Sequence, residues 1–209
     1  ARKAAAAERA ARERAERLAE ALRQQQELSE QREKRRKGEG ANTRVSTTDP
    51  DSRKMKMANG GFDPAYNVQF ATDADARVIV GVDVTNEGTD GGQLPGMLDQ
   101  VSSDYGKRPE TALVDSAYAT KEAVTQAERG GTEVVSTVPR SDQLEQHGKN
   151  PHERQKGDTD EYAKFRARMA QQEYQTLYKQ RPSIAEFANA DCRNRGLRQF
   201  RVRGLEKVR

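Results

Sequence analysis

The sequence has little cysteine, few aromatic residues and no long apolar run. Cys192 is the single cysteine among 209 residues, and tryptophan is absent. One cysteine excludes a disulfide within the chain and a zinc site built from cysteines, and it fits a reducing compartment. No apolar run is long enough to cross a membrane, and the start shows no signal-peptide pattern. We therefore expect no membrane association.

Apolar residues are also scarce overall. Only 33% of the residues are hydrophobic, 33% are charged, and the mean hydropathy is -1.08. Such a chain cannot form a large core along its whole length, so part of it should be solvated helix or linker. Lys and Arg number 37 against 33 acids, a net charge of +4. Because this excess is modest, the distribution of the charge matters more than its total.

The first 37 residues consist mostly of Ala, Arg, Glu, Gln and Leu, which are strong helix formers. Their large apolar residues are only Leu18, Leu22 and Leu28. This stripe is too thin for a coiled coil, so we expect a long, mostly solvated helix or a helical hairpin that serves as a spacer. Gly38 and Gly40 should end it. We assign 1–40 to this helical segment and 41–60 to a loop.

Residues 61–209 have the pattern of an α/β domain. "PAYNVQFAT" and "RVIVGVDVT" are rich in β formers and flank a turn-like "DADA", which predicts an antiparallel hairpin. A helix follows in "GGQLPGMLDQVSSDYG", with Asp90 as its candidate cap. "TALVD", "TKEAVTQAERGG" and "TEVVSTVP" then predict strand, helix and strand. The order indicates a sheet covered by helices.

Residues 140–160 are polar, contain Gly and Pro, and predict a linker or a surface insertion. His147 and His152 lie in this stretch. Two histidines in a polar stretch are more often solvated than bound to metal. Helical character returns from Tyr162 to Leu197 and is interrupted near Pro182.

The last segment, 193–209, carries seven Lys or Arg and one acid, with Leu197, Phe200 and Val202 between them. Basic residues interleaved with apolar ones suit contact with a phosphate backbone. The alternative is a solvated edge strand with protective charges.

Two acids stand on predicted strands. Asp115 ends the run "ALVD", and polar residues at the carboxyl ends of strands face the functional crevice of an α/β sheet. The alternative for Asp115 is a helix cap, for which Thr120 competes. Asp83 lies in "IVGVDVTN", where alternation places it on the face of Ile79 and Gly81.

The sequence supports two interpretations of Glu186. "SIAE" fits a capping box, in which Glu186 only satisfies backbone donors at a helix start. On a continuous helix, however, Glu186 and Arg193 differ by roughly 20° in direction. One face would then offer a carboxylate to a metal ion and a guanidinium to a phosphate. Carboxylates from two elements can hold two divalent ions that clamp the oxygens of phosphoryl transfer.

Four segments together resemble bacterial insertion-sequence transposases of the D-D-E type. They are "STTDPDSRKMKMANGGFDPAYNVQFATD", "VIVGVDVTNEGTDGGQL", "LVDSAYAT" and "YKQRPSIAEFANADCRNRGLRQFRVRG". The resemblance implies a ribonuclease-H-like mixed sheet flanked by helices over 61–209, after a charged helical insertion. It implies Mg²⁺ or Mn²⁺, two ions per site, double-stranded DNA at transposon ends and target, and a homo-oligomer on DNA in the bacterial cytoplasm, at the nucleoid.

The resemblance also implies residue roles. Asp115 takes the position of the second acid, and Glu186 that of the third, in a Y-x2-R-x4-E arrangement with Tyr178 and Arg181. The basic residues expected to support DNA binding are Arg193, Arg195, Arg198, Arg201 and Arg203.

The first acid of the family normally lies in a "DGT"-like segment on the first strand, which has no counterpart here. We expect this acid and its strand to be missing, the chain to be a piece of a longer protein, and this piece to be inactive alone. Asp83 is the less favoured substitute. Two other functions stay open: an inactive remnant or domesticated DNA-binding protein, and a structural protein that associates through its charged helix.

Overall fold

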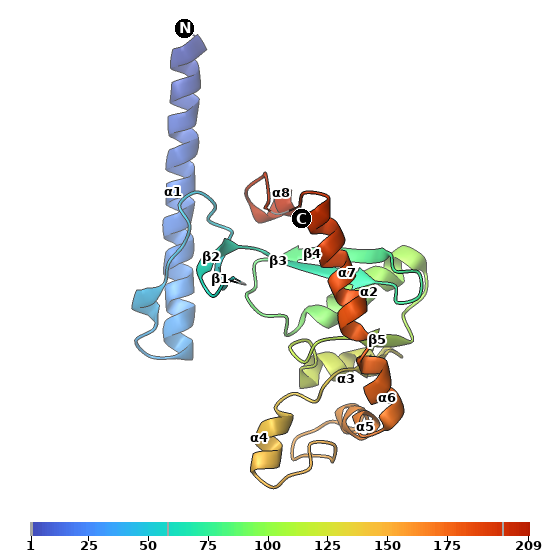
Figure 1. The fold of residues 1–209 in the computed structure, drawn as a ribbon. Coiled ribbons are helices and arrows are strands. Elements are labelled where there is room, and N and C mark those ends of the chain that lie inside the picture. The colour runs from blue at the N-terminus through green and yellow to red at the C-terminus, as the bar shows by residue number, and fades with distance from the viewer. Residues whose placement is uncertain (1, 58, 198) are drawn as a thin grey trace. The chain divides into compact units, whose positions relative to one another are not determined.

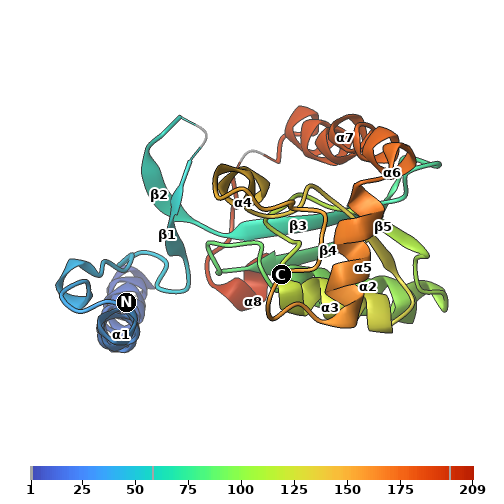
Figure 2. The same ribbon diagram turned by 90° about the horizontal axis from the view of Figure 1, so that it is seen from below.

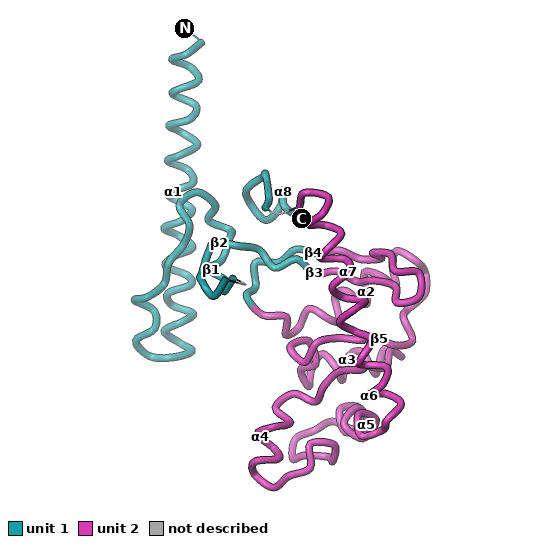
Figure 3. Tube along the Cα trace, in the orientation of Figure 1, with its two compact units in different colours: residues 1–68, 84–88, 199–209 teal, residues 69–83, 89–198 magenta. Residues whose placement is uncertain are grey.

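The computed structural model describes residues 2–57, 59–197 and 199–209 of a mixed α/β protein with small sheets and a long N-terminal helix (Figure 1). The chain divides into two compact units (Figure 3). Unit 1 contains residues 1–68, 84–88 and 199–209, and unit 2 contains 69–83 and 89–198. No helix within the described ranges has the length and apolar character needed to cross a bilayer.

Unit 1 begins with the predicted helix, α1, which runs without a break from Arg2 to Arg35. It is one long helix, not a hairpin, and nearly all of its side chains are exposed. Its end is closed by Glu33, whose carboxylate accepts hydrogen bonds from the N–H groups of Gly38 and Gly40 at 2.9 and 3.1 Å. These bonds hold the pKa of Glu33 below its usual value. A 3-10 turn, η1, follows at Gly40–Asn42.

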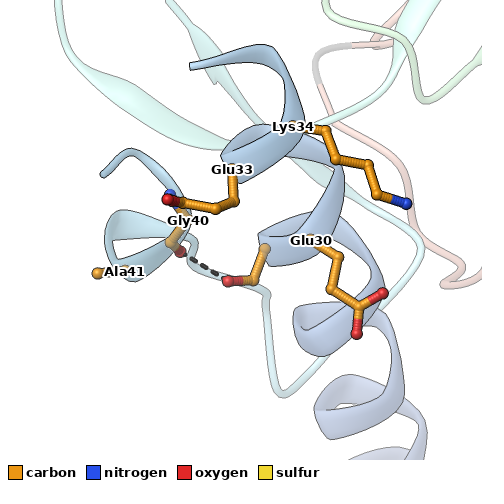
Figure 4. A pocket seen from close by; sticks show the side chains of 6 residues that line it. Glu30, Glu33, Lys34, Gly40 and Ala41 are labelled. Carbon is orange, nitrogen blue, oxygen red and sulfur yellow. Dashed lines mark hydrogen bonds between the residues drawn. The ribbon is translucent and has the colours of Figure 1, made fainter. Parts of the chain in front are cut away.

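A surface pocket lies beside this helix end, between α1 and η1 (Figure 4). The hydroxyl of Ser29 donates to the carbonyl oxygen of Gly40 at 2.9 Å, which ties the turn to the helix. Glu33 is turned toward Gly40, whereas Glu30 and Lys34 point away from it. The side chains of Ser29 and Glu33 therefore hydrogen-bond to the backbone that follows α1 and close this helix end.

Unit 1 also contains an antiparallel hairpin of β1 (Arg53–Lys56) and β2 (Phe62–Ala65). The expectation of a loop over 41–60 is thus wrong at its end. β1 was missed because its four residues include three cations, and its strand form comes from pairing with β2. Leu205–Val208 of the basic tail form a short helix, α8, and none of the described tail residues lies in a strand, so the edge-strand alternative is also wrong.

Strands β3 (Asn67–Thr72) and β4 (Ile79–Thr85) form the predicted hairpin, and the boundary between the units falls inside both. Helix α2 (Gln93–Tyr105) packs against unit 2's part of the hairpin. The contact is close at Gly81, where an added Cβ would lie 2.8 Å from the Sδ atom of Met97. A larger residue than glycine would displace the Met97 side chain and crowd Ala71 and Val101, at 3.2 and 3.3 Å from the added Cβ.

Strands β5 (Thr111–Leu113) and β6 (Glu133–Val135) are parallel and are connected through helix α3 (Lys121–Arg129). The predicted order of strand, strand, helix, strand, helix and strand is confirmed from β3 to β6. The described strands pair as three two-stranded sheets. One continuous sheet therefore stays a prediction.

Four further helices follow: α4 (Ser141–Gln146), α5 (Asp160–Met169), α6 (Gln172–Tyr178) and α7 (Arg181–Asn194). Helices α3 and α5 lie side by side (Figure 2), and with β5, β6 and α2 they enclose the core. The buried core residues are Leu94, Leu98, Ala119, Ala123, Val124, Ala127, Val134, Val135, Val138, Tyr162, Phe165 and Met169.

The polar stretch 140–160 contains α4 and is tied to the core near its end by Asp158. The buried carboxylate of Asp158 accepts from Nε of Arg166 and lies 2.8 Å from Nζ of Lys121. Arg166 also donates to the carbonyl oxygen of Pro151 at 2.7 Å. Buried charges need such partners, because desolvation otherwise outweighs their attraction.

Candidate functional site

Asp115 lies just past the carboxyl end of β5. The N–H of Val114 still donates to the carbonyl oxygen of Val135 at 3.0 Å, and the chain then turns, with Tyr118 N–H bonded to the carbonyl of Asp115 at 3.0 Å. Thr120 is the N-cap of α3 and accepts from the N–H of Ala123. The cap alternative for Asp115 is thereby wrong, and its carboxylate, 46% exposed, is left for another role.

The partner of this carboxylate is Arg181. A terminal guanidinium nitrogen of Arg181 donates to Oδ2 of Asp115 at 2.8 Å. The guanidinium carbon lies 5.9 Å from the ring centroid of Tyr178. Oδ1 of Asp115 accepts from the hydroxyl of Ser116 at 3.2 Å. The structure thus brings together three of the residues selected from the sequence, Asp115, Tyr178 and Arg181.

The start of α7 determines where these groups lie. Helix α6 ends at Tyr178, and α7 begins at Arg181, so the two residues belong to different helices. Pro182 is at the second position of α7, where its missing N–H removes no helical bond. The capping box is wrong: Gln180 precedes the helix without a side-chain cap, and the hydroxyl of Ser183 donates to the carbonyl of Gln180 at 2.9 Å.

Glu186 lies on the exposed side of α7. Ala188 is buried, and two helical residues correspond to about 200° of rotation, so Glu186 is directed almost opposite to it. Asp83 lies in β4 and is half-buried. The structure therefore pairs Asp115 with a cation, and within the described ranges it gathers no group of three acids.

A chain of hydrogen bonds beside Asp115 is not predictable from the sequence. Gln69 of β3, 3% exposed, accepts from the hydroxyl of Tyr118 and donates to Oδ1 of Asp90 at 3.0 Å. Burial, followed by the negative charge of Asp90, raises the pKa of Tyr118 to about 12. The phenol therefore stays a donor at neutral pH. The only sign of this chain in the sequence is Gln69 itself, a polar residue between apolar neighbours in a predicted strand.

Asp90 has a role other than the predicted one. The N-cap of α2 is Gly92, with φ of 95°, which has no side chain with which to cap the helix. The carbonyl oxygen of Asp90 accepts from the N–H of Gln93 at 3.1 Å, whereas its carboxylate accepts from Gln69. The prediction of Asp90 as the cap is wrong, because the flexible glycines start the helix two residues later.

The basic residues of the tail are exposed where they are described. Arg193 and Arg195 belong to unit 2, and Arg195 pairs with Asp191 at 2.8 Å. Arg201 and Arg203 belong to unit 1. Arg198 lies outside the described residues.

The described residues do not fit a divalent ion on their own. Nowhere in the described ranges do three His, Cys, Asp or Glu side chains gather closely enough to hold a metal. The carboxylate of Asp115 is a suitable ligand type for Mg²⁺ or Mn²⁺, but Arg181 takes up one of its oxygens. Of the two histidines, His147 is exposed, and its Nδ1 lies 2.7 Å from the carbonyl oxygen of Gln143, while His152 is half-buried.

The chain was compared with known protein families, curated proteins and solved structures. The family described as "Transposase DDE domain" matches residues 12–209, which is nearly the whole chain. No curated protein and no solved structure matches it.

Proposed function

The chain belongs to the transposase DDE domain family, and from this premise we propose that it acts in metal-dependent DNA strand cleavage and strand transfer at insertion-sequence ends. The observation that carries the proposal is the position of Asp115. It is a half-exposed carboxylate at the carboxyl end of a parallel strand, with the guanidinium of Arg181 against it. An acid and a phosphate-binding cation at one strand end suit phosphodiester chemistry.

Asp115 and Glu186 are the proposed metal-binding acids, with Asp83 as the less favoured substitute for a further one. DDE transposase domains generally use divalent metal ions, and Mg²⁺ or Mn²⁺, two per site, is proposed here. The described residues do not assemble such a site, so no reaction step is assigned to the ions. The role proposed for Arg181, with Tyr178 under its guanidinium, is to hold Asp115 and to contact a DNA phosphate.

The proposed fold is ribonuclease-H-like, incomplete in its first strand, with residues 61–209 as the catalytic domain and 1–40 as a helical insertion or spacer. The order of elements from β3 to β6 supports this assignment. The proposed setting is the bacterial cytoplasm, at the nucleoid, as a homo-oligomer on DNA.

A second candidate function is DNA binding without cleavage. The observation that favours it is that no three acids gather within the described ranges. For that reason we expect the 209-residue chain alone to bind double-stranded DNA and not to cleave it. The binding groups would be the exposed tail arginines, with Arg198 included from the sequence.

The experiment measures fluorescence anisotropy of a labelled DNA duplex over a series of salt concentrations. The chain should bind, and the logarithm of its affinity should fall linearly with the logarithm of salt. Arg193→Ala should weaken binding and lower that slope by about 0.9. A matched control, Arg154→Ala, removes an exposed cation of the 140–160 insertion that pairs with Asp160. Absence of binding at low salt, or equal effects of the two variants, would contradict the proposal.

A further inference from the structure

The β1–β2 hairpin has two different faces. In its register Lys54 is opposite Pro64, and Lys56 is opposite Phe62. Directly opposed residues of an antiparallel pair share a face, and alternate residues of one strand do too. One face, here called the outer face, therefore consists of Lys54, Lys56, Phe62 and Pro64. All four are exposed, Phe62 at 57%.

The opposite face of the hairpin is partly covered by other residues of unit 1. Arg53 lies there, and one of its terminal nitrogens donates to the carbonyl oxygens of Pro50 and Asp51 at 2.9 Å. Met55 is half-buried on the same side, and a Cβ added to Gly88 would lie 4.0 Å from its Cγ. Arg53, Met55 and Ala65 on this side are partly buried, whereas the four residues of the outer face are exposed.

The hairpin is also closed at its tip. The N–H of Met57 donates to the carbonyl oxygen of Gly61 at 2.8 Å, and the N–H of Gly61 donates to the side-chain oxygen of Asn59 at 2.9 Å. The outer face is thus carried on a hairpin that is closed by hydrogen bonds at its tip.

The charge of the outer face is of one sign. No carboxylate within the described ranges forms an ion pair with Lys54 or Lys56, and Asp63 alternates onto the opposite face. The ammonium nitrogen of Lys54 lies 5.1 Å from the ring centroid of Phe62. The ammonium of Lys54 therefore lies against an exposed aromatic ring, Lys56 is opposite that residue in the register, and neither lysine has a carboxylate partner within the described ranges.

We propose that the outer face binds DNA at a junction with unpaired bases, with Lys54 and Lys56 at phosphates and the ring of Phe62 stacked on an unpaired base. Cations suit the phosphates, and an exposed ring suits a base that has lost its neighbour. The inference rests on the proposed function only in taking DNA as the partner. The competing explanation is that the lysines merely protect a strand edge from pairing with another chain.

The test uses the full chain and two labelled DNAs, a blunt duplex and the same duplex with a short single-stranded overhang. The variant Lys54→Ala/Lys56→Ala should weaken binding to both DNAs and lower the salt slope by about 1.4 to 1.8, the sum for two phosphate contacts. The control, Lys149→Ala/Lys156→Ala, removes two exposed lysines elsewhere and should lower it less. Circular dichroism should be unchanged in every variant.

Phe62 separates base stacking from charge. Phe62→Ala should lower affinity for the overhang DNA about tenfold and leave the blunt duplex unchanged, whereas Phe62→Tyr should restore overhang binding. Equal effects of the two lysine pairs, or equal loss on both DNAs in Phe62→Ala, would overturn the inference while leaving DNA binding intact. Failure of the unaltered chain to bind either DNA would instead overturn both this inference and the proposed function.

Discussion

Arg181 and Asp115 form an ion pair of 2.8 Å across 66 positions of the sequence. The pair joins the first residue of α7 to the end of β5, so it places the helix that carries Glu186 relative to the strand end that carries Asp115. The sequence resemblance treats these residues as parts of one reaction site. The structure shows one direct contact among them, between an acid and a cation.

Removing this contact should have a small effect on stability. Arg181→Ala should lower the free energy of unfolding by about 1 kcal/mol or less, because partly exposed ion pairs contribute little. Arg181→Lys keeps the charge but loses the planar contact with Tyr178. Its free energy of unfolding should lie between those of the unaltered chain and Arg181→Ala. Urea denaturation measures both. A loss of several kcal/mol would show that Arg181 supports the fold rather than the site.

Tyr118 should titrate well above an ordinary tyrosine. The difference in alkaline absorbance between the unaltered chain and Tyr118→Phe should give a pKa of about 12. Because folding raises this pKa, the stabilisation is fully present below the unfolded value of about 10 and is lost as pH rises through the folded value. Asp90→Asn removes a nearby negative charge and should lower the pKa. A pKa near 10 in the unaltered chain would contradict the packing around Gln69.

The ion pair of Arg168 and Glu128 should contribute far more to the free energy of unfolding than an exposed ion pair between the same two helices. Their side chains are only 9% and 11% exposed, and Arg168 also donates to the carbonyl oxygen of Val134 at 2.9 Å. Arg168→Ala should cost about 3 to 5 kcal/mol, because it leaves a buried carboxylate without its cation.

The matched control for Arg168 lies on the same pair of helices. Arg129 of α3 pairs with Glu161 of α5 at 2.9 Å on the surface. Arg129→Ala should cost about 1 kcal/mol or less. Chemical denaturation of both variants gives the comparison, and similar costs would contradict the burial of the Arg168 pair.

Asp158 should contribute to acid sensitivity. Burial has the largest single influence on its pKa and raises it, but the hydrogen bonds from Lys121 and the N–H of Gln155, with the charge of Arg166, outweigh burial and lower the pKa. Its stabilisation is therefore present above the unfolded value of about 4 and is lost as pH falls through the lower folded value. The difference in free energy of unfolding between the unaltered chain and Asp158→Asn should decrease as pH falls through this range. A difference independent of pH would contradict the network.

Local features were predictable from the sequence. Helix formers from residue 1 to 37 predicted α1, and the alternation of β-rich runs with helical runs predicted the order from β3 to β6. Thr120 was recognised as a competing cap because its hydroxyl precedes a helical run. These features depend on residues close together in the chain, which is where propensity and periodicity carry information.

Contacts between distant residues were not predictable in the same way. Nothing in the neighbourhood of Gln69 indicates Tyr118, 49 positions away, and nothing near Asp115 indicates Arg181. The cation-rich β1 reads as a loop until its partner strand is known. Asp158 lies in a polar stretch, and its burial depends on Arg166, eight residues further on.

The most direct test of the proposed function is a plasmid-nicking assay with Mg²⁺ and with Mn²⁺. The protein is expressed from its complete reading frame, unaltered and as Asp115→Asn and Glu186→Gln, with DNA affinity measured in parallel. We expect the unaltered protein to nick DNA, both variants to lose nicking while retaining affinity, and the 209-residue chain to bind without nicking. Nicking by either variant at the unaltered rate would contradict the assignment of these two acids.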